Sequence, residues 1–374
     1  ALKARFPYRK WRVGNGDFCG SMYNQCPITF EITMSQGKYA ESLKPISMSR
    51  TRQNQKEAAA TDGEIGALRA VNGAVNWLAG QSRPDLSIQV SKSQQCFPRP
   101  LVQDLHNANL MVRRARQHAD CDVIFRFIPP NKLTTCTHTD AAYANATEHK
   151  TQAGNLIAFT HVNLNEGHEA NWTPACWRSY RLPRVVNSTL SGEAQAFSTA
   201  SGTVEWIMLL IAEAIDGPFD LRTVNEVLTR RKPILVVDCK SLYDHIVSMS
   251  APSVLDDRRT AIDIAIITQS VIRCGLIVRW APTDRMLADA LTKDKGDPAD
   301  LLRSVLRSGV YQIADEHTVL QNKAEERTRR QNKGALNAEN NKHKHGKKLE
   351  TQSETADTQD ATFISPPPEL CIKT

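Results

Sequence analysis

The sequence predicts an α/β fold, with a mixed five-stranded sheet flanked by helices in the middle of this 374-residue chain. Three β-prone runs follow one another between residues 126 and 182, and a long helix-patterned segment comes next. Two short apolar runs, residues 233–238 and 275–282, close the series. Because strands precede and then alternate with helices, we expect one sheet covered by helices.

Composition places the chain among globular proteins, because 41% of its residues are hydrophobic and can form buried cores. No apolar run approaches the roughly 18 residues that span a bilayer, and the first residues lack the apolar core of a signal peptide. Neither secretion nor membrane insertion is expected. The nine cysteines include no C-x-x-C pair, which favours reduced thiols. A formal charge of +7 suits a polyanionic partner, with solubility as the plain alternative.

Residues 1–125 carry a more helical pattern. Short β-like runs and turn residues occupy about the first 60 positions, and apolar residues recurring every three or four positions from Leu68 to Leu78 predict a helix. Pro84 is suited to open the next helix, and residues 101–120 predict a third. Three arginines crowd its last turns, where they either favour the helix dipole or contact phosphate: Arg113, Arg114 and Arg116.

The elements of the predicted sheet can be taken in order. "KLTTCTHTD", "AGNLIAFTHV" and "PACWRSYRL" predict three strands, and alternating apolar spacings of four and three from Leu190 to Ile211 predict a long helix. "PILVVD" is typical of a strand covered on both faces. A helix is expected over residues 256–273 with Gly275 ending it, and "GLIVRWAP" predicts the last strand.

The end of the chain has a different composition. Beyond about residue 318 it is charged, amide-rich and poor in large apolar residues, so it cannot offset the entropy of ordering. Residues 301–374 are therefore expected to form a short helix followed by a disordered tail. The run "NKHKHGKK" is expected to be a solvated charge run, with phosphate contact or a nuclear signal as the alternative.

Four acids stand at the ends of the predicted elements: Asp140 ends the first strand, Glu193 opens the long helix, Asp238 ends "PILVVD", and Asp289 follows the last strand. Acids so placed gather at one edge of an α/β sheet. Their repulsion is tolerable only with cations between them, and carboxylate oxygens select Mg²⁺ or Mn²⁺. Taken singly, each acid has a plainer explanation as a helix cap or dipole partner.

These segments resemble the reverse transcriptase and ribonuclease H portion of a copia-type LTR retrotransposon Pol polyprotein. "HTDAAYA", "LSGEAQAFSTAS", "VVDCKSLYD" and "APTDRMLADALTK" match the family's acidic segments over about residues 126–295, and "ADALTK" is the most diagnostic. The resemblance implies a ribonuclease H-like fold over residues 126–300. It also implies two Mg²⁺ ions, or Mn²⁺, held by four catalytic acids: Asp140, Glu193, Asp238 and Asp289.

Upstream, "ITMSQGKYAESLK" and "LRAVNGAVNWLAGQSRPDLSIQVS" resemble the family's last polymerase segments. Residues 1–125 are therefore expected to be a C-terminal fragment of the reverse transcriptase, with the end of the palm and a thumb- or connection-like part. The Tyr-x-Asp-Asp hairpin is absent, and Asp256 and Asp257 are no substitute because they precede a helix. DNA synthesis is not expected without the polymerase part of the polyprotein. Ala261 replaces the histidine of the family's "HID" segment, which is expected to weaken turnover.

The resemblance implies hydrolysis of the RNA strand of RNA/DNA hybrids during reverse transcription, in a cytoplasmic virus-like particle or the nucleus. Strand discrimination would depend on the 2′-OH. Expected contacts to sugar and phosphate are Asn187, Ser188, Thr189, Gln195, Arg178, Arg181 and Arg184. Two alternatives stay open. One is a truncated or decayed element that only binds nucleic acid, and the other is a small-molecule phosphohydrolase, disfavoured by the absence of a G-x-x-x-x-G-K-[ST] loop.

Overall fold

The computed structural model describes residues 12–248, 257–294, 296 and 298–314, together with a few single positions outside these ranges. By their contacts, residues 1–315 form one compact unit, separate from residues 316–374. Asp256, the run "NKHKHGKK" and nearly all of the predicted disordered tail lie outside the described residues.

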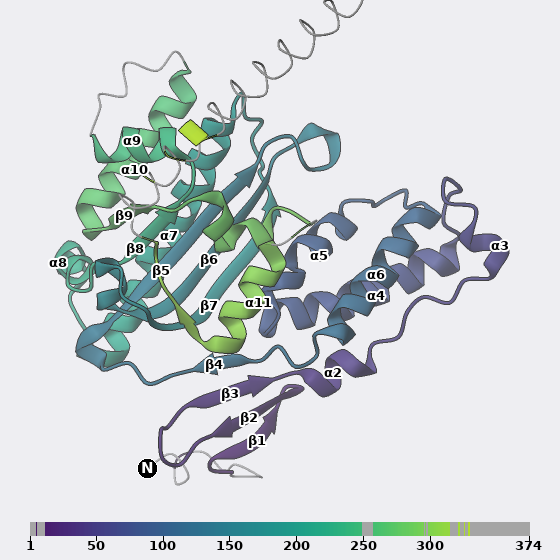
Figure 1. Cartoon of the computed structure of the whole chain (residues 1–374), viewed down its shortest axis with the longest axis horizontal. Helices are drawn as coiled ribbons and strands as arrows, with labels where there is room; N and C mark the ends of the chain where they lie inside the picture. Colours follow the sequence, from purple (N-terminus) through teal and green to yellow (C-terminus); the bar gives the residue numbers. More distant parts are fainter. Residues whose placement is uncertain are drawn as a thin grey trace, which may run out of the picture. The chain divides into compact units, whose positions relative to one another are not determined.

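A six-stranded mixed sheet organises the structure (Figure 1). Three long strands are antiparallel neighbours: β5 (Leu133–Ala142), β6 (Gln152–His161) and β7 (Ala170–Arg181). Two short strands, β8 (Ile234–Val237) and β9 (Ile277–Trp280), extend the sheet parallel to β5. The predicted mixed α/β class is confirmed, and the arrangement is broadly consistent with a ribonuclease H-like fold.

The sixth strand corrects the prediction of five. Val310 and Tyr311 (β10, Val310–Tyr311) pair with Asn171 and Ala170 along the free edge of β7. A strand of two residues has no alternating pattern that a sequence could reveal. Its pairing follows from the preceding helix α11 (Pro298–Ser308), which returns the chain to this edge.

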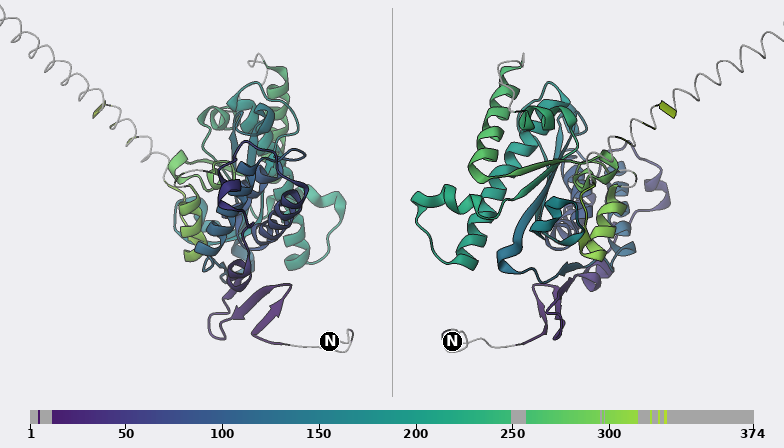
Figure 2. Two further views of the ribbon diagram at one scale, coloured as in Figure 1. Left: turned by 90° about the vertical axis from the view of Figure 1, so that its right-hand side faces the viewer. Right: turned by 60° about the vertical axis from the view of Figure 1, so that its left-hand side comes forward.

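Helices cover both faces of the sheet (Figure 2). One face packs against α7 (Thr189–Asp216), α8 (Val224–Thr229), α9 (Lys240–Val247) and α10 (Arg258–Cys274), and the other against α11 and the 3-10 helix η8 (Leu287–Leu291). The fully buried β8 supplies both cores, because successive side chains of a strand point to opposite faces. Ile234 and Val236 join the core under α11, whereas Leu235 and Val237 join the core under α7.

Local signals define the two long helices of the first face. Ser188 caps α7 by accepting a hydrogen bond from the Ser191 main-chain nitrogen over 3.1 Å, and Phe197 and Val204 lie in its buried stripe. Gly275 ends α10 with φ +59°, a left-handed conformation that glycine adopts readily, as the sequence predicted. Both predicted helices are thus confirmed.

The described residues before the large sheet contain a second, antiparallel sheet and the helices α2 to α6 (Figure 1). Its strands are β1 (Asn15–Phe18), β2 (Ser21–Gln25), β3 (Ile32–Ser35) and β4 (Val123–Phe125), in that spatial order. Its helices are α2 (Gly37–Ser42), α3 (Arg50–Gln53), α4 (Asp62–Gln81), α5 (Ser87–Gln94) and α6 (Val102–Gln117). Cys19 and Gly20, both with positive φ, form the tight turn between β1 and β2.

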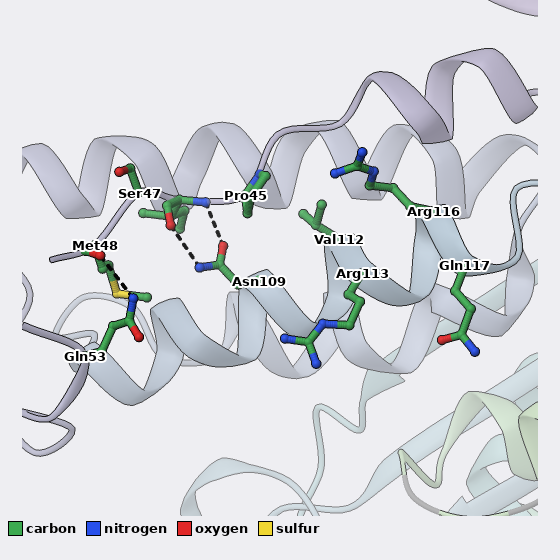
Figure 3. Close-up of a pocket in the computed structure, with 10 residues that line it drawn as sticks. Pro45, Ser47, Met48, Gln53, Asn109, Val112, Arg113, Arg116 and Gln117 are labelled. Carbon is green, nitrogen blue, oxygen red and sulfur yellow. Dashed lines mark hydrogen bonds between the residues drawn. The ribbon is translucent and has the colours of Figure 1, made fainter. Parts of the chain in front are cut away.

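A groove of about 860 Å³ lies between α6 and the extended segment before α3 (Figure 3). Asn109 fixes that segment, because its side chain accepts a hydrogen bond from the Ile46 main-chain nitrogen over 2.6 Å and donates one to the Ile46 oxygen over 2.9 Å. Arg113 and Arg116 line the groove with exposed guanidinium groups. The third predicted arginine, Arg114, instead donates to the main-chain oxygen of Asp294.

A buried ionic network joins the helical region to the large sheet. Arg83 donates two hydrogen bonds of 2.8 Å to Asp85, and Arg303 of α11 donates a third over 3.2 Å. Desolvation raises the pKa of Asp85, but the two guanidinium groups outweigh it and hold this pKa below its usual range. Asp85 is fully buried, so the network couples two parts of the chain more than 200 residues apart.

Within the described part of the chain, each cysteine is a free thiol, in agreement with the predicted reduced state. Among the same residues, no helix combines the length and the hydropathy that a membrane span requires.

Candidate metal centre

Asp140 lies near the end of β5, the strand that β6 and β8 flank on its two sides. Both faces of β5 are covered, and Asp140 is only 3% exposed. It stands opposite Gly154 in the register with β6. The Thr292 hydroxyl donates a hydrogen bond to Asp140 Oδ2, which orients this carboxylate.

Asp238 directly follows β8. Because β5 and β8 run parallel, their carboxyl ends lie at the same edge of the sheet, and Asp238 comes close to Asp140. The Thr283 hydroxyl donates a hydrogen bond of 2.9 Å to Asp238 Oδ2. Trp280 Nε1 donates to the Asp238 main-chain oxygen over 2.9 Å, so both the backbone and the side chain of this acid are held.

Asp289 belongs to η8, which packs directly on β6. Gly154 permits this close approach, because a Cβ at that position would lie 2.7 Å from Leu291 Cβ and 3.0 Å from Thr292 Cγ2. The Ser179 hydroxyl of β7 donates a hydrogen bond of 2.5 Å to the Leu291 main-chain oxygen. The sheet therefore holds the turn that carries Asp289.

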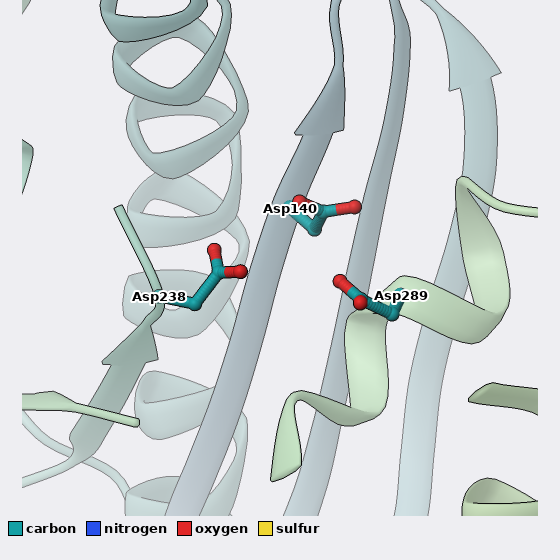
Figure 4. A group of neighbouring side chains, drawn as sticks. All are labelled: Asp140, Asp238 and Asp289. Atoms are coloured by element: carbon teal, nitrogen blue, oxygen red, sulfur yellow. The ribbon is translucent and has the colours of Figure 1, made fainter. Parts of the chain in front are cut away.

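The three aspartates converge. One carboxylate oxygen from each of Asp140, Asp238 and Asp289 lies within 4.8 Å of the other two. Figure 4 shows the carboxylates pointing toward one another from β5, from the end of β8 and from η8. Oxygen donors are the ligands that Mg²⁺ and Mn²⁺ prefer, so this buried group can hold a divalent cation.

Glu193, the fourth predicted acid, lies in the first turns of α7 and is 3% exposed. Its Oε1 accepts a hydrogen bond of 3.3 Å from the Ala141 main-chain nitrogen. Its Oε2 has no hydrogen-bond partner among the described residues. Burial, followed by the charges of Asp140 and Asp238, raises the pKa of Glu193 well above its ordinary value. Glu193 is not among the acids whose oxygens converge within 4.8 Å, but its unpaired buried oxygen and the effect of Asp140 and Asp238 on its pKa fit a further metal ligand.

The electrostatics of the cluster also fit a cation. Burial raises the pKa of Asp289 to about 7, the charge of Asp140 adds to the rise, and Lys293 opposes it. Burial and Asp140 raise the pKa of Asp238 in the same way. Like Glu193 Oε2, Asp289 Oδ1 is buried without a hydrogen-bond partner in the part of the chain that the structure describes. A bound divalent ion would relieve both the repulsion and the unpaired oxygens.

The predicted sugar contacts lie at the start of α7. Asn187, Ser188 and Thr189 are exposed, but the Ser188 side chain is occupied by its capping bond. Gln195, in contrast, is only 7% exposed. Asn187 and Thr189 are therefore the more accessible of the four predicted residues.

Two of the three predicted phosphate-contacting arginines make contacts near the end of β7. The guanidinium group of Arg178 lies 4.6 Å from the centroid of the Tyr180 ring. Arg181 lies 3.8 Å from Glu148, in an ion pair whose partners are 38% and 68% exposed. Both arginines remain exposed, and contacts of this kind are weak enough to exchange for a phosphate.

The third arginine, Arg184, contacts Asp263 of α10. Its Nη2 donates to both carboxylate oxygens of Asp263, over 2.8 and 3.0 Å. Asp263 is 4% exposed, and Ala261 lies two residues before it on the same helix. Through Arg184, Asp263 thus holds the connection between β7 and α7.

Several residues that shape the site were not predicted from the sequence: Gly154, Thr283, Thr292 and Lys293. For Thr292 and Lys293 a signal was present, because they follow Asp289 by three and four positions, the spacing that brings side chains together on one turn. Gly154 and Thr283 carry no such signal, since their partners lie far away in sequence.

These features define an α/β protein with a buried acidic centre suited to a divalent cation. No protein-family model matches the chain. No curated protein matches it either.

Among solved structures, the foamy viral protease-reverse transcriptase in complex with RNA/DNA hybrid is similar over 42% of this chain and 19% of that chain, with 14% identity and a TM-score of 0.24. The foamy viral protease-reverse transcriptase in complex with dsDNA is similar over 44% of this chain and 96% of that chain, with 15% identity and a TM-score of 0.25. At TM-scores this low, the function must be argued from the residues of the site itself.

Proposed function

We propose that the chain is the ribonuclease H of a copia-type LTR retrotransposon reverse transcriptase, which hydrolyses the RNA strand of RNA/DNA hybrids. In this proposal residues 126–300 form the nuclease domain, and residues 1–125 form the last part of the reverse transcriptase. The observation that carries the proposal is the convergence of carboxylate oxygens from the buried Asp140 and Asp289 and the half-buried Asp238. The resemblance of the sequence segments around these acids supports the same function.

The metal ligands in this proposal are Asp140, Glu193, Asp238 and Asp289, which would hold two Mg²⁺ or Mn²⁺ ions. When bound, such a pair lowers the pKa of water and stabilises charge on the attacking and leaving oxygens of a phosphodiester. The chain orients the ligands through the hydroxyls of Thr292 and Thr283, which donate hydrogen bonds to Asp140 and Asp238.

The substrate would be held by groups next to the acidic centre. Asn187 and Ser188 immediately precede the helix that carries Glu193, and Thr189 is its first residue, so the three are suited to contact the sugar of the strand being cut. Gln195, which lies on α7, would add a further contact to the sugar. Only RNA offers a 2′-OH at that sugar, which would distinguish the two strands of a hybrid. Arg178, Arg181 and Arg184 would contact phosphates.

The nuclease proposal is tested by incubating the purified chain with end-labelled RNA/DNA hybrid and Mg²⁺. We expect cleavage of the RNA strand by the wild type and a loss of at least about 100-fold in Asp140→Asn and Asp238→Asn, because each removes a ligand charge. Asp244→Asn, which alters an exposed aspartate on α9, serves as the matched control and should cleave normally. Cleavage that survives in both ligand variants would rule out this site.

A second candidate function is binding of nucleic acid without cleavage, by an element that has lost activity. The observation that favours it is Ala261 in place of the family histidine. The same assay separates the two functions, because a binding module retains the hybrid in a mobility-shift gel but leaves its RNA intact. Ala261→His should raise the cleavage rate of an active enzyme and leave an inactive one unchanged.

A further inference from the structure

A basic side chain occupies the acidic centre. Lys293 Nζ donates a hydrogen bond of 2.6 Å to Asp289 Oδ2, and the Lys293 main-chain nitrogen donates to the Asp289 oxygen over 2.8 Å. One turn of backbone therefore fixes both partners. The Lys293 side chain is 37% exposed, whereas that of Asp289 is 4% exposed. Asp289 forms an ion pair with Lys293. Among the described residues, Asp140 and Asp238 have no ion-pair partner.

The charge of Lys293 acts on the whole cluster. Desolvation lowers the pKa of Lys293, but the carboxylates of Asp140, Asp289 and Asp238 together raise it above its ordinary value. Thr292 and Thr283 also bind cluster oxygens, but as neutral hydroxyls, so they leave the charge of the carboxylates unbalanced. In the absence of metal, Lys293 is therefore the group that offsets the repulsion.

Lys293 and a divalent ion would bind the same carboxylate. A metal ion at the unpaired Asp289 Oδ1 would lie near the ammonium group that binds Oδ2 of the same carboxylate, and two cations repel strongly in a partly buried site. The long aliphatic stem of lysine lets the ammonium move toward solvent. Metal binding is thus expected to weaken the ion pair between Lys293 and Asp289 through this repulsion.

We propose that Lys293 is an internal counter-cation of the metal centre, which holds Asp289 in place without metal and competes with the divalent ion for it. This role rests on the proposed metal site and makes Lys293 a positioning residue. The competition raises the metal concentration at which the site fills. It also keeps three neighbouring carboxylates compatible with the folded state before metal arrives.

The experiment compares three variants of the full chain. Lys293→Met removes the charge and keeps the aliphatic stem, and Lys293→Arg keeps the charge. Lys150→Met is the matched control, because it removes the same net charge from a lysine that lies 3.5 Å from Glu148 outside the cluster. Titration calorimetry gives the Mg²⁺ and Mn²⁺ dissociation constants, and thermal unfolding in EDTA gives the stability of the metal-free protein.

We expect Lys293→Met to bind Mg²⁺ about tenfold more tightly than the wild type, because the competing charge is gone. Its Tm in EDTA should fall, and the rise in Tm on adding Mg²⁺ should be larger than in the wild type. Lys293→Arg and Lys150→Met should retain the wild-type dissociation constant. Lys293→Gln serves as a second neutral variant if Lys293→Met does not fold.

Unchanged or weaker Mg²⁺ binding by both neutral variants would overturn the counter-cation role while leaving the metal site intact. If the wild type binds no Mg²⁺, or binds it equally well after Asp140→Asn, the metal site itself is wrong and the counter-cation role falls with it. The two failures are therefore distinguishable in one set of titrations.

Discussion

At the scale of single residues, protonation of Asp289 should link metal-free stability to pH. Its pKa is raised to about 7 by burial and by Asp140, against about 3.9 in an unfolded chain. Between these values the folded state binds more protons than the unfolded state, so this group makes the protein less stable as pH rises. The loss is complete above about pH 7 and disappears when metal binds.

The measurement is thermal unfolding in EDTA between pH 5 and pH 8, for the wild type and Asp289→Asn. The variant should become progressively more stable than the wild type as pH rises, by about 1 kcal/mol or more at pH 8, which corresponds to roughly 2 to 4 °C in Tm. The comparison is needed because burial lowers the pKa of His138 to about 3, which works in the opposite direction below pH 6.5. A pH-independent difference would contradict the raised pKa.

Gly154 is the second residue on which the geometry of the acidic centre depends, because it has no side chain. Gly154→Ala would place a Cβ against Leu291 and Thr292, so η8 must move away from the sheet. We expect a loss of about 1 to 3 kcal/mol in unfolding free energy and weaker Mg²⁺ binding, measured by urea unfolding and calorimetry. Gly202→Ala on α7 is the control, because its Cβ meets no atom within 4 Å and should stabilise the helix slightly. Equal stability of both variants would contradict this account.

At the scale of elements, the sequence predicted the helices and strands that are determined by local patterns, such as apolar spacing and helix-ending glycines. The long helix α7 and the buried strand β8 follow from apolar spacing, and Gly275 marks the end of α10. The four acids were singled out because they stand at the ends of predicted elements, and the structure brings three of them together, Asp140, Asp238 and Asp289, partly through the parallel pairing of β5 with β8. Contacts that join distant segments left no local pattern. β4 pairs with β3 across about 90 residues, and Gly154 matters only through η8.

The pair formed by Arg184 and Asp263 should control substrate binding through the connection between β7 and α7. Asp263→Asn would remove the charge that holds Arg184, and the exposed residues at the start of α7 would lose their support. We expect KM for the hybrid to rise about three- to tenfold with kcat nearly unchanged, since the metal ligands are untouched. Arg259→Met, an exposed residue of the same helix, is the control. A fall in kcat alone would contradict a positioning role for Asp263.

At the scale of the whole molecule, the network of Arg83, Asp85 and Arg303 should contribute strongly to stability. Asp85→Asn would leave the buried Arg83 without its carboxylate partner and would take from Arg303 its buried one, which costs about 3 to 5 kcal/mol. Asp300→Asn is the matched control, because Asp300 binds the same Arg303 but is 69% exposed and should cost less than about 1 kcal/mol. Urea unfolding measures both variants. Equal losses of unfolding free energy in the two variants would contradict a larger contribution of the buried network to stability.

The helical region also contacts the segment that follows the acidic centre. Lys92 of α5 lies 3.4 Å from Asp294, and Arg114 of α6 donates to the Asp294 main-chain oxygen. On the same side, Ser91 and Gln95 bind Gln152 at the start of β6. The position of Lys293 and Thr292 therefore depends on helices that lie far upstream in the sequence.

The buried partnership of Asp85 with Arg303 has a consequence for proteolysis. A protease that nicks the stretch between β4 and β5 would sever the backbone, yet the upstream fragment would still neutralise a guanidinium group of the downstream one. Separation would break the buried ion pair between Asp85 and Arg303, so the nicked halves should migrate together on gel filtration until a denaturant is added. Cleavage at that loop would thus change the number of chains without separating the upstream helices from the large sheet.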